Sequence, residues 1–406
     1  MRVLILNQAF YPDVVSSAQH ASDLARKLAA RGFEVTVLAS SHGYDDPEVR
    51  FPVLERWCGI EIRRVRHSNL GKASKWRRGA DFASFYLACA WRLLWIGSFD
   101  AVIAMTSPPL ISFLSAVFAK WRRGKLFLWM MDMNPDEAIA AGWIQPKSLL
   151  TRVLERSLRY SFRSSERIVV LDRFMRDRVL ARSGSSKVAI VPPWTHDSAV
   201  HYDDEGRRRF RREHGLEGKF VVMYSGNHSP CHPLNTLLEA ALALAAHTDI
   251  AFCFIGGGSE FANLKSFVFE HGLENVSCLP YQPLESLSAS LSSADLHVIA
   301  MGDSFVGIVH PCKVYNILKL GIPFLYIGPP ESHVTDMVPR EGAGWARLSQ
   351  HGEIDRVVAQ ILEAKETGPK RYAEEIGLST SYSEDELTQV MFEFVEGSMN
   401  PSQSLR

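Results

Sequence analysis

The sequence lacks several features that would assign it directly to a class of protein. Its 406 residues include 45 Lys and Arg and 45 Asp and Glu, so no net charge attracts nucleic acid. Residues such as Arg92 and Pro108 interrupt the apolar runs before they reach the roughly 18 residues of a membrane-spanning helix. The six cysteines have no CxxC spacing, which favours reduced, buried thiols in the cytoplasm over a disulfide framework.

Short apolar runs alternate with helical patterns along the whole chain, as in an α/β protein with parallel sheets. Residues 2–6 predict a buried strand rather than a signal peptide. Residues 18–31 predict a helix that ends at Gly32, and 33–39 the next strand. Further strands are predicted at 101–105, 126–131, 167–171 and 188–191, then at 220–224, 250–255, 276–279, 296–300 and 324–327.

Between the two series lies a polar, charged stretch from 201 to 219, which marks a domain boundary near residue 196. The sequence therefore predicts two Rossmann-like domains, 1–195 and 196–375. An amphipathic helix near 385–395, within a C-terminal segment 376–406, is expected to cross back to the first domain.

Glycine is missing from the first strand-to-helix turn, residues 7–17. A backbone that closely approaches a pyrophosphate needs glycine there, so this turn argues against a dinucleotide dehydrogenase. Ser16 and Ser17 stand just before the predicted helix. They either contact a substrate on the acceptor side or cap the helix.

The second series of strands is followed by the glycine-containing turns that the first strand of the chain lacks. Gly226 follows the strand 220–224, and Gly256, Gly257 and Gly258 follow the strand 250–255. Parallel strands end at one edge of a sheet, which is where α/β proteins bind ligands. Both turns are therefore expected at that edge, where backbone amides at a helix N-terminus can face a phosphate.

Lys313 is predicted in the first turn of a helix that follows Pro311 and ends at Gly321. A lysine in this place opposes the helix dipole, so it does not serve helix stability. An anion shared by Lys313 and the helix amides would explain it. The alternative is a solvated surface lysine.

Taken with these motifs, the chain resembles the family 4 retaining glycosyltransferases of the GT-B fold. In the first half the segments 10–12, 106–109, 132–135, 169–171 and 191–194 are similar to a bacterial polysaccharide subgroup that includes colanic acid enzymes. In the second half 224–227, 256–258 and 311–313 are similar to the donor-site pattern of that subgroup. The resemblance implies two domains facing each other across a cleft, with the donor on the second.

The chain departs from the family pattern at charged positions. Asn227 and His232 stand where many members have Arg and Lys, and Asn316 replaces the second of two glutamates, with Asp303 as the nearest acid to the first. Lys313 would supply the missing charge. The expected donor-binding residues are Gly226, Asn227, His228, His232, Gly257, Tyr281, Asp303, Gly307, Ile308, Val309, Lys313 and Asn316.

The implied reaction moves a sugar from a nucleotide-sugar donor, with a UDP-sugar favoured over a GDP-sugar, to a hydroxyl of a lipid-linked or saccharide acceptor. Lys313 and Asp132 are the catalytic candidates. Lys313, with the 226–228 turn and the amides near 307–309, would stabilise the leaving diphosphate. Asp132 either positions or deprotonates the acceptor, or caps the helix near Pro135.

His228 and His232 stand without clustered carboxylates or thiols, so we expect no metal and no other cofactor. Two other functions remain open: a sugar-nucleotide epimerase of the same fold, and an inactive sugar-nucleotide-binding protein. Donor turnover with an acceptor would separate them from a transferase.

Basic residues precede an apolar, aromatic helix in the first domain. They are Arg63, Arg64, Arg66, Lys72, Lys75, Arg77 and Arg78, and the helix contains Phe82, Phe85, Tyr86, Trp91, Leu94 and Trp95. Trp121, Arg122, Arg123 and Lys125 follow a second apolar helix. This pattern indicates either peripheral contact with an anionic membrane, at the inner face of the cytoplasmic membrane, or a helix pair packed in the core with arginines at its rim. No nucleic-acid-binding module accompanies it.

Overall fold

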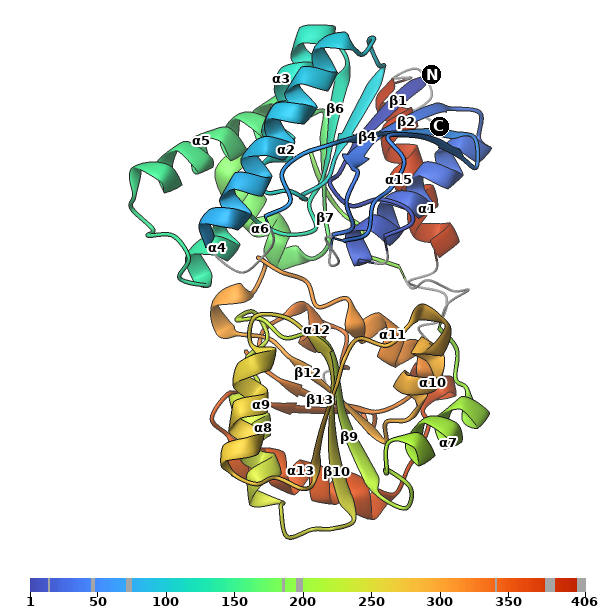
Figure 1. Cartoon of the computed structure of the whole chain (residues 1–406), viewed down its shortest axis with the longest axis vertical. Helices are drawn as coiled ribbons and strands as arrows, with labels where there is room; N and C mark the ends of the chain where they lie inside the picture. The colour runs from blue at the N-terminus through green and yellow to red at the C-terminus, as the bar shows by residue number, and fades with distance from the viewer. Residues whose placement is uncertain are drawn as a thin grey trace. The chain divides into compact units, whose positions relative to one another are not determined.

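The computed structural model describes residues 1–13, 15–44, 48–70, 75–184, 187–194, 200–339, 342–376 and 384–399 (Figure 1). The chain divides into two compact units. Unit 1 runs from Met1 to Pro193 and takes in the C-terminal residues from Asp385 onward, and unit 2 runs from Trp194 to Glu384. The division falls two residues before the predicted boundary.

Unit 1 is built on an eight-stranded sheet in the order β3-β4-β2-β1-β5-β6-β7-β8. Every pair is parallel except β3 with β4. The strands are β1 (Arg2–Leu6), β2 (Glu34–Ser40), β3 (Leu54–Trp57), β4 (Ile60–Val65), β5 (Ala101–Ala104), β6 (Lys125–Trp129), β7 (Arg167–Val170) and β8 (Val188–Ile190). The helices are α1 (Ser16–Ala30), α2 (Lys75–Trp95), α3 (Ile111–Arg122), α4 (Asp136–Ala140), α5 (Leu149–Ser164), α6 (Arg173–Ser183) and α15 (Glu384–Met399).

Unit 2 has a six-stranded parallel sheet in the order β11-β10-β9-β12-β13-β14. Its strands are β9 (Phe220–Asn227), β10 (Ile250–Gly257), β11 (Val276–Leu279), β12 (Leu296–Ala300), β13 (Phe324–Ile327) and β14 (Ala346–Ser349). Its helices are α7 (Asp204–Glu213), α8 (Asn235–Ala243), α9 (Phe261–Glu270), α10 (Leu287–Ser292), α11 (Lys313–Leu320), α12 (His333–Asp336), α13 (Ile354–Thr367) and α14 (Ala373–Ile376), with 3₁₀ turns η1 (Leu284–Ser286) and η2 (Asp303–Phe305). The predicted class, α/β with two Rossmann-like domains, is confirmed.

Alternation along β9 places the core of unit 2 on both faces of its sheet. Val222 packs with α8, α9 and α13, whereas Val221 and Met223 pack with the α7 and α10 side. The strand order reverses between β9 and β12, which are neighbours in the sheet. Ligands of open α/β sheets bind beyond the carboxyl ends of the strands at such a point.

The polar stretch that marked the domain boundary is not a linker, because it contains helix α7. Asp203 caps this helix by accepting a hydrogen bond from the Gly206 amide, at 2.8 Å. Arg207 and Arg211 both pair with the buried carboxylate of Asp295, each at 2.5 Å. Two arginines on one buried carboxylate fix α7 on the sheet, although the sequence of the helix is mostly polar.

Helix α15 packs against α1, so the last part of the chain belongs to unit 1. Lys27 pairs with Asp385 at 2.5 Å, and the Phe33 and Phe392 rings meet edge to face at 5.5 Å.

Within the described residues, none of the helices is both long enough and apolar enough to cross a bilayer.

Candidate functional site

The two glycine turns of unit 2 lie side by side at the carboxyl edge of its sheet. In the β9–β10 register Gly226 stands opposite Gly256, and Asn227 opposite Gly257. Gly226 and Gly256 have φ values of +141° and +137°, which side-chain-bearing residues rarely adopt. A Cβ on Gly256 would come within 2.0 Å of the Gly226 carbonyl oxygen. The expectation that both turns share one edge is confirmed, and Gly256 is required for their close approach.

Lys313 is the first residue of α11, and its ammonium lies inside this edge. The Nζ atom lies 3.6 Å from the centroid of the Tyr224 ring, and a Cβ on Gly226 would be 2.9 Å from it. Although the residue as a whole is partly exposed, Nζ is buried and has no hydrogen-bond partner among the described residues. Burial lowers the pKa of Lys313 to about 7. The surface-lysine alternative is therefore wrong, and the position suits an anion that would satisfy the ammonium.

The two predicted histidines beside Lys313 are neutral. Burial, and then the charge of Lys313, lowers the pKa of His228 to about 4 and that of His232 to about 3. Nδ1 of His232 lies 2.9 Å from the carbonyl oxygen of Ala300, so Nδ1 carries the proton and Nε2 can accept a hydrogen bond. The His228 ring lies near the Tyr224 and Phe261 rings. Neither imidazole adds positive charge, so Lys313 carries the charge of this group alone.

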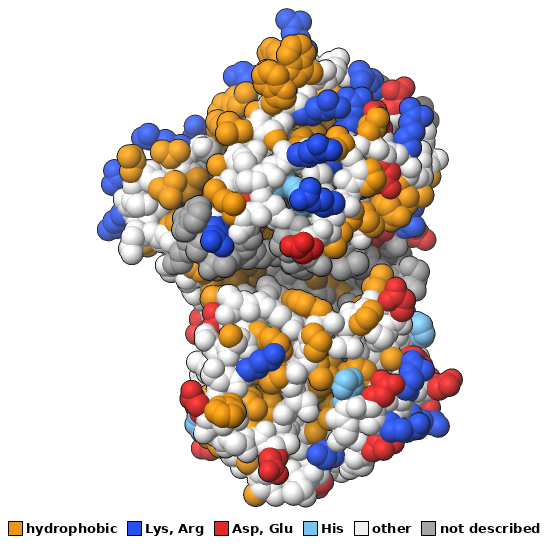
Figure 2. Space-filling model, viewed as in Figure 1, with side chains coloured by type: hydrophobic (Ala, Val, Ile, Leu, Met, Phe, Trp, Pro, Cys, Tyr) orange, Lys and Arg blue, Asp and Glu red, His pale blue; other side chains and the backbone are white. Residues whose placement is uncertain are grey.

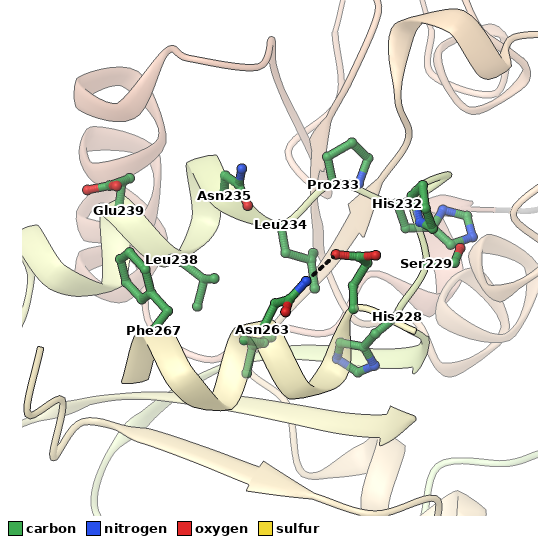
Figure 3. A pocket seen from close by; sticks show the side chains of 13 residues that line it. His228, Ser229, His232, Pro233, Leu234, Asn235, Leu238, Glu239, Asn263 and Phe267 are labelled. Carbon is green, nitrogen blue, oxygen red and sulfur yellow. Dashed lines mark hydrogen bonds between the residues drawn. The ribbon is translucent and has the colours of Figure 1, made fainter. Parts of the chain in front are cut away.

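A pocket of about 550 Å³ opens next to these histidines, between α8 and α9 (Figure 3). His228 and His232 are the predicted residues that line it. Its charged lining is acidic, from Glu239 and Glu260, and it includes no Lys or Arg. A diphosphate is therefore better placed at Lys313 than in this pocket, whose carboxylates and amides suit hydroxyl groups. Nothing in the sequence pattern indicated these carboxylates, because Glu239 lies on α8 and Glu260 is the residue just before α9.

The segment after β12 does not have the donor-binding role that the sequence predicted for the amides near 307–309. The amides of Ile308 and Val309 both donate to the Phe305 carbonyl oxygen, at 2.9 and 3.2 Å, and both side chains are buried. They are therefore not available to a leaving phosphate in this structure. Gly307, with φ +68°, makes the turn possible. Asp303 begins the 3₁₀ turn η2 and is exposed, unlike the buried ammonium of Lys313.

Three further predicted residues border the edge of the sheet. Tyr281 is half exposed, and its hydroxyl donates to the Gly257 carbonyl oxygen at 3.3 Å. Asn227 is exposed, and its carbonyl oxygen accepts a hydrogen bond from the Tyr224 hydroxyl at 2.7 Å. Asn316 lies one turn after Lys313 on α11 and is partly exposed. Gly226, Asn227, Gly257 and Tyr281 thus lie together, and Lys313 contacts this group through Gly226.

In unit 1, Asp132 follows β6 in a partly buried loop. Burial, together with the nearby charge of Glu137, raises the pKa of Asp132 well above its usual range. Helix α4 begins only at Asp136, and no side chain caps it. The capping alternative for Asp132 is therefore wrong. The sequence analysis did not single out Glu137. Its only indication in the sequence is that it is a second carboxylate, five residues after Asp132.

The serines of the first turn in unit 1 do not cap α1. The N-cap is Val15, which has no side-chain cap, and Ser16 and Ser17 are the first two helical residues. The Ser16 carbonyl oxygen lies 2.9 Å from Nδ1 of the buried His20. The capping alternative is wrong, and the acceptor-side assignment of these serines stays a prediction.

Only some side chains of the basic cluster predicted before α2 are exposed at the surface. Arg64 occupies an inward position of β4 and is buried, where it donates to Glu55 at 2.6 Å and to the Tyr11 carbonyl oxygen at 2.6 Å. It cannot face a membrane. Arg63 pairs with Glu61 at 2.8 Å, while Arg66 and Arg77 are exposed. Lys72 and the side chains of Lys75 and Arg78 lie outside the described residues.

Two family models match the chain, one for each unit. The model described as "Glycosyl transferase 4-like domain" matches residues 17–194, and "Glycosyl transferases group 1" matches residues 206–325. The second match begins after the unit boundary and ends in β13, so it includes both glycine turns and Lys313.

Two curated bacterial proteins are similar in sequence. The putative colanic acid biosynthesis glycosyl transferase WcaI of Escherichia coli K12 is 22% identical over 345 residues, which is 79% of this chain and 82% of WcaI. The probable glycosyltransferase WbjE of Pseudomonas aeruginosa is 22% identical over 250 residues, 61% of this chain. That match spans 62% of WbjE, less than two thirds of its length.

Solved structures share the fold over nearly the whole chain. Sucrose-phosphate synthase from Thermosynechococcus elongatus has a TM-score of 0.74 at 13% identity and covers 99% of this chain and 100% of its own. HepE of Anabaena, in complex with UDP-glucose, has a TM-score of 0.71 at 13% identity, with 98% and 100% covered. At such identities the likeness establishes the fold.

Proposed function

Because the chain belongs to the family 4 type of GT-B glycosyltransferases, in the subgroup of colanic-acid-type bacterial enzymes, we propose that it moves a sugar from a nucleotide-sugar donor to an acceptor hydroxyl with retention of the anomeric configuration. Unit 2 binds the donor, and unit 1 supplies the acceptor side. One relative, WcaI, is named for the biosynthesis of colanic acid. The alternatives are a sugar-nucleotide epimerase and an inactive sugar-nucleotide-binding protein, and the turnover experiment described below distinguishes them from a transferase.

One observation carries the donor assignment: a buried ammonium that has no hydrogen-bond partner in the described part of the chain lies beside two glycine turns. Lys313 Nζ contacts the Tyr224 ring and lies next to Gly226, at the point where the strand order of unit 2 reverses. A diphosphate at the glycine turns would satisfy this cation. Since both histidines are neutral, no other predicted donor-site residue offers a positive charge.

The charge of Lys313 would matter most as the reaction proceeds. When the bond between the anomeric carbon and the phosphate oxygen breaks, the electron pair goes to the diphosphate, whose negative charge grows. A fixed ammonium stabilises this state more than the ground state, and so lowers the barrier. Retention is consistent with a front-face displacement, in which the acceptor oxygen bonds to the anomeric carbon and its proton passes to the departing phosphate.

Asp132 is the proposed acceptor-side group in unit 1. It does not cap α4, and the nearby Glu137 carboxylate shares its buried surroundings. A carboxyl group whose pKa is raised toward the working pH can exchange a proton or hold a hydroxyl in place. We assign it the orientation of the acceptor hydroxyl, with Ser16 and Ser17 on the same side of the reaction.

A UDP-sugar is the proposed donor and a GDP-sugar the alternative. HepE, which shares the fold, was solved with UDP-glucose, and this supports the uridine choice. The acceptor is a lipid-linked or saccharide hydroxyl in the biosynthesis of a cell-surface polysaccharide or glycolipid. The enzyme acts in the cytoplasm, in peripheral contact with the inner face of the membrane, and needs no metal ion.

The test begins with a panel of nucleotide sugars in thermal-shift assays on the full chain. A donor that stabilises the protein is then incubated with lipid-linked acceptors, and the products are identified by mass spectrometry. Transfer to the acceptor supports the proposal. Conversion of the donor sugar without acceptor indicates an epimerase, and binding without turnover indicates an inactive protein.

Amide exchange with the bound donor tests the assignment to unit 2. Protection is expected near Gly226, Gly257 and Lys313. Protection confined to residues 1–190 would place the donor on unit 1 and overturn the assignment.

A further inference from the structure

Helix α2 carries apolar side chains on two opposite faces. Phe85, Cys89 and Leu93, spaced at helical intervals, are buried against the sheet of unit 1. A second stripe, also at helical spacing, faces solvent. It consists of Leu87, Trp91, Leu94 and Trp95, and Trp91 and Trp95 are 64% and 71% exposed. A surface helix of a globular protein normally has one apolar face, so the second stripe calls for a partner.

The neighbouring helices extend this exposed apolar surface. Along α3, Phe113, Val117 and Trp121 are exposed at intervals of four residues. The Arg122 side chain donates to the Leu94 carbonyl oxygen at 3.0 Å and lies over the Trp121 ring, which joins α3 to α2. The Phe113 and Tyr160 rings meet at 5.7 Å, which joins α3 to α5. At the start of α5, Leu149, Leu150 and Val153 are also exposed.

Positive charge surrounds these apolar side chains. Helix α5 carries an exposed basic stripe at helical spacing, made of Arg152, Arg156, Arg159 and Arg163. Arg92, Lys120 and Arg123 are exposed near the ends of α2 and α3. In the sequence of the three helices the acidic residues are Asp81 and Glu155. Figure 2 shows hydrophobic side chains together with Lys and Arg over this part of unit 1.

We propose that the α2–α3–α5 face of unit 1 is a docking surface for an anionic lipid bilayer. Tryptophan side chains partition to the bilayer interface, and arginines beside them attract acidic headgroups. A second copy of the chain would bring the same basic stripe against itself, which disfavours a dimer through this face. The proposal rests on the membrane contact in the proposed function but not on sugar transfer, because vesicle binding needs no donor.

The surface differs from the one that the sequence indicated. Arg63 and Arg64 lie on β4, where Arg64 is buried and Arg63 is paired with Glu61. The structure instead assigns the basic contribution to α5, which sequence reasoning did not include. Phe85, which the sequence placed in the membrane-facing group, belongs to the core.

The test uses co-sedimentation of the full chain with vesicles of phosphatidylcholine alone and of phosphatidylcholine mixed with phosphatidylglycerol. We expect binding to the mixed vesicles, weakened by salt, with a blue shift of tryptophan fluorescence. Arg152→Glu with Arg156→Glu should reduce the partition coefficient at least about tenfold, since each basic residue near such a surface contributes about 1 kcal/mol. The matched control is Arg209→Glu on α7, an exposed arginine of unit 2.

A second pair of variants tests the apolar stripe. Trp91→Ser with Trp95→Ser should abolish binding to the mixed vesicles, whereas Phe269→Ser, which removes an 88% exposed aromatic side chain from α9 of unit 2, should not. Thermal melts confirm that each variant folds. The proposal is overturned if the parent ignores mixed vesicles, if the tryptophan variant binds like the parent, or if the tryptophan variant instead dissociates a dimer. Transfer to a soluble acceptor, measured alongside, reports separately on the reaction.

Discussion

The first strand-to-helix turns of the two units have the same place in the fold and opposite contents. After β1 the turn is filled by side chains: the Asn7 amide donates to the Ala9 carbonyl oxygen at 2.7 Å, and Tyr11 stacks on Trp57 at 4.2 Å. After β9 the turn is backbone and glycine, with a buried ammonium against it. In the first unit side chains fill the turn, whereas in the second the backbone lies close to an ammonium that has no hydrogen-bond partner among the described residues.

The largest effect on activity is expected from a substitution of Asp132 in unit 1, whose first turn is filled by side chains. Asp132→Asn keeps the shape of the side chain but cannot take up a proton. If Asp132 orients the acceptor hydroxyl, kcat should fall by about a hundredfold, since a misplaced reacting group can cost about 10²-fold in rate. Donor affinity should stay unchanged. Steady-state kinetics and donor titration together decide; a loss of donor affinity equal to the loss in kcat would place Asp132 on the donor side.

The next effect in size concerns Lys313, in the unit with the open turn. A hydrogen bond to a charged group contributes roughly 1.5–3 kcal/mol. Lys313→Ala should therefore lower kcat/KM by about ten- to a hundredfold, with kcat itself reduced because charge grows on the leaving group.

Lys370→Ala is the matched control for this change. Lys370 also lies over a tyrosine ring of unit 2, Tyr372 at 4.7 Å, but it is exposed and near Glu375. Parental kinetics for Lys313→Ala would remove this lysine from the site.

Donor binding should depend on pH through the same group. With its pKa lowered to about 7, the unliganded protein holds the ammonium below that pH and loses it as the pH rises. A bound diphosphate favours the charged form, so donor affinity should be highest below about pH 7. Above it, affinity should fall by up to about tenfold per pH unit, with proton uptake on binding.

Titration calorimetry in two buffers of different ionisation enthalpy measures this uptake. The intact nucleotide sugar is the ligand, because its diphosphate has no terminal phosphate group that titrates near neutrality. Lys313→Arg stays charged across this range and should flatten the pH dependence. Proton uptake that survives in the arginine variant would assign the titration to another residue.

The smallest predicted effect is on stability. The folded pKa of Lys313 is depressed from an unfolded value near about 10.4, so between the two values the unfolded chain binds the extra proton. The stability penalty is full below about pH 7 and disappears as the pH rises toward the unfolded pKa. Lys313→Met should raise the melting temperature at pH 6 by roughly 2–4 °C for each kcal/mol removed. The prediction would be contradicted if Lys313→Met lowered the melting temperature at that pH while Lys370→Met left it unchanged, because burial of the Lys313 ammonium would then not destabilise the protein.

The fold was predictable where the chain is strongly apolar. The strands 276–279, 296–300 and 324–327 coincide with β11, β12 and β13, because runs of this length that are flanked by turn residues favour strands over helices. Strand β4 was missed because Glu61, Arg63 and Arg64 occupy half of its positions. That omission also misassigned Arg64, whose inward place in the strand alternation makes it a buried residue.

The candidate site was predictable only in outline. Glycine turns and a lysine at a helix start can be recognised from residue types and spacing. The Ile308 and Val309 amides could not be judged in this way, because whether a backbone donor is already bonded to the Phe305 carbonyl depends on loop geometry. The Asp132–Glu137 pair and the α5 basic stripe likewise depend on which side chains the fold buries.

The packing of α15 on α1 has a consequence for how the protein is made. Phe392 lies against Phe33 and under the Arg31 guanidinium, so the helix near the chain's end completes a unit whose strands are all made before residue 193. During synthesis the ribosome must finish the whole of unit 2 before this helix can dock. One flank of α1 therefore stays uncovered until α15 has been synthesised, and a chain truncated before Glu384 would have a first unit without this covering helix.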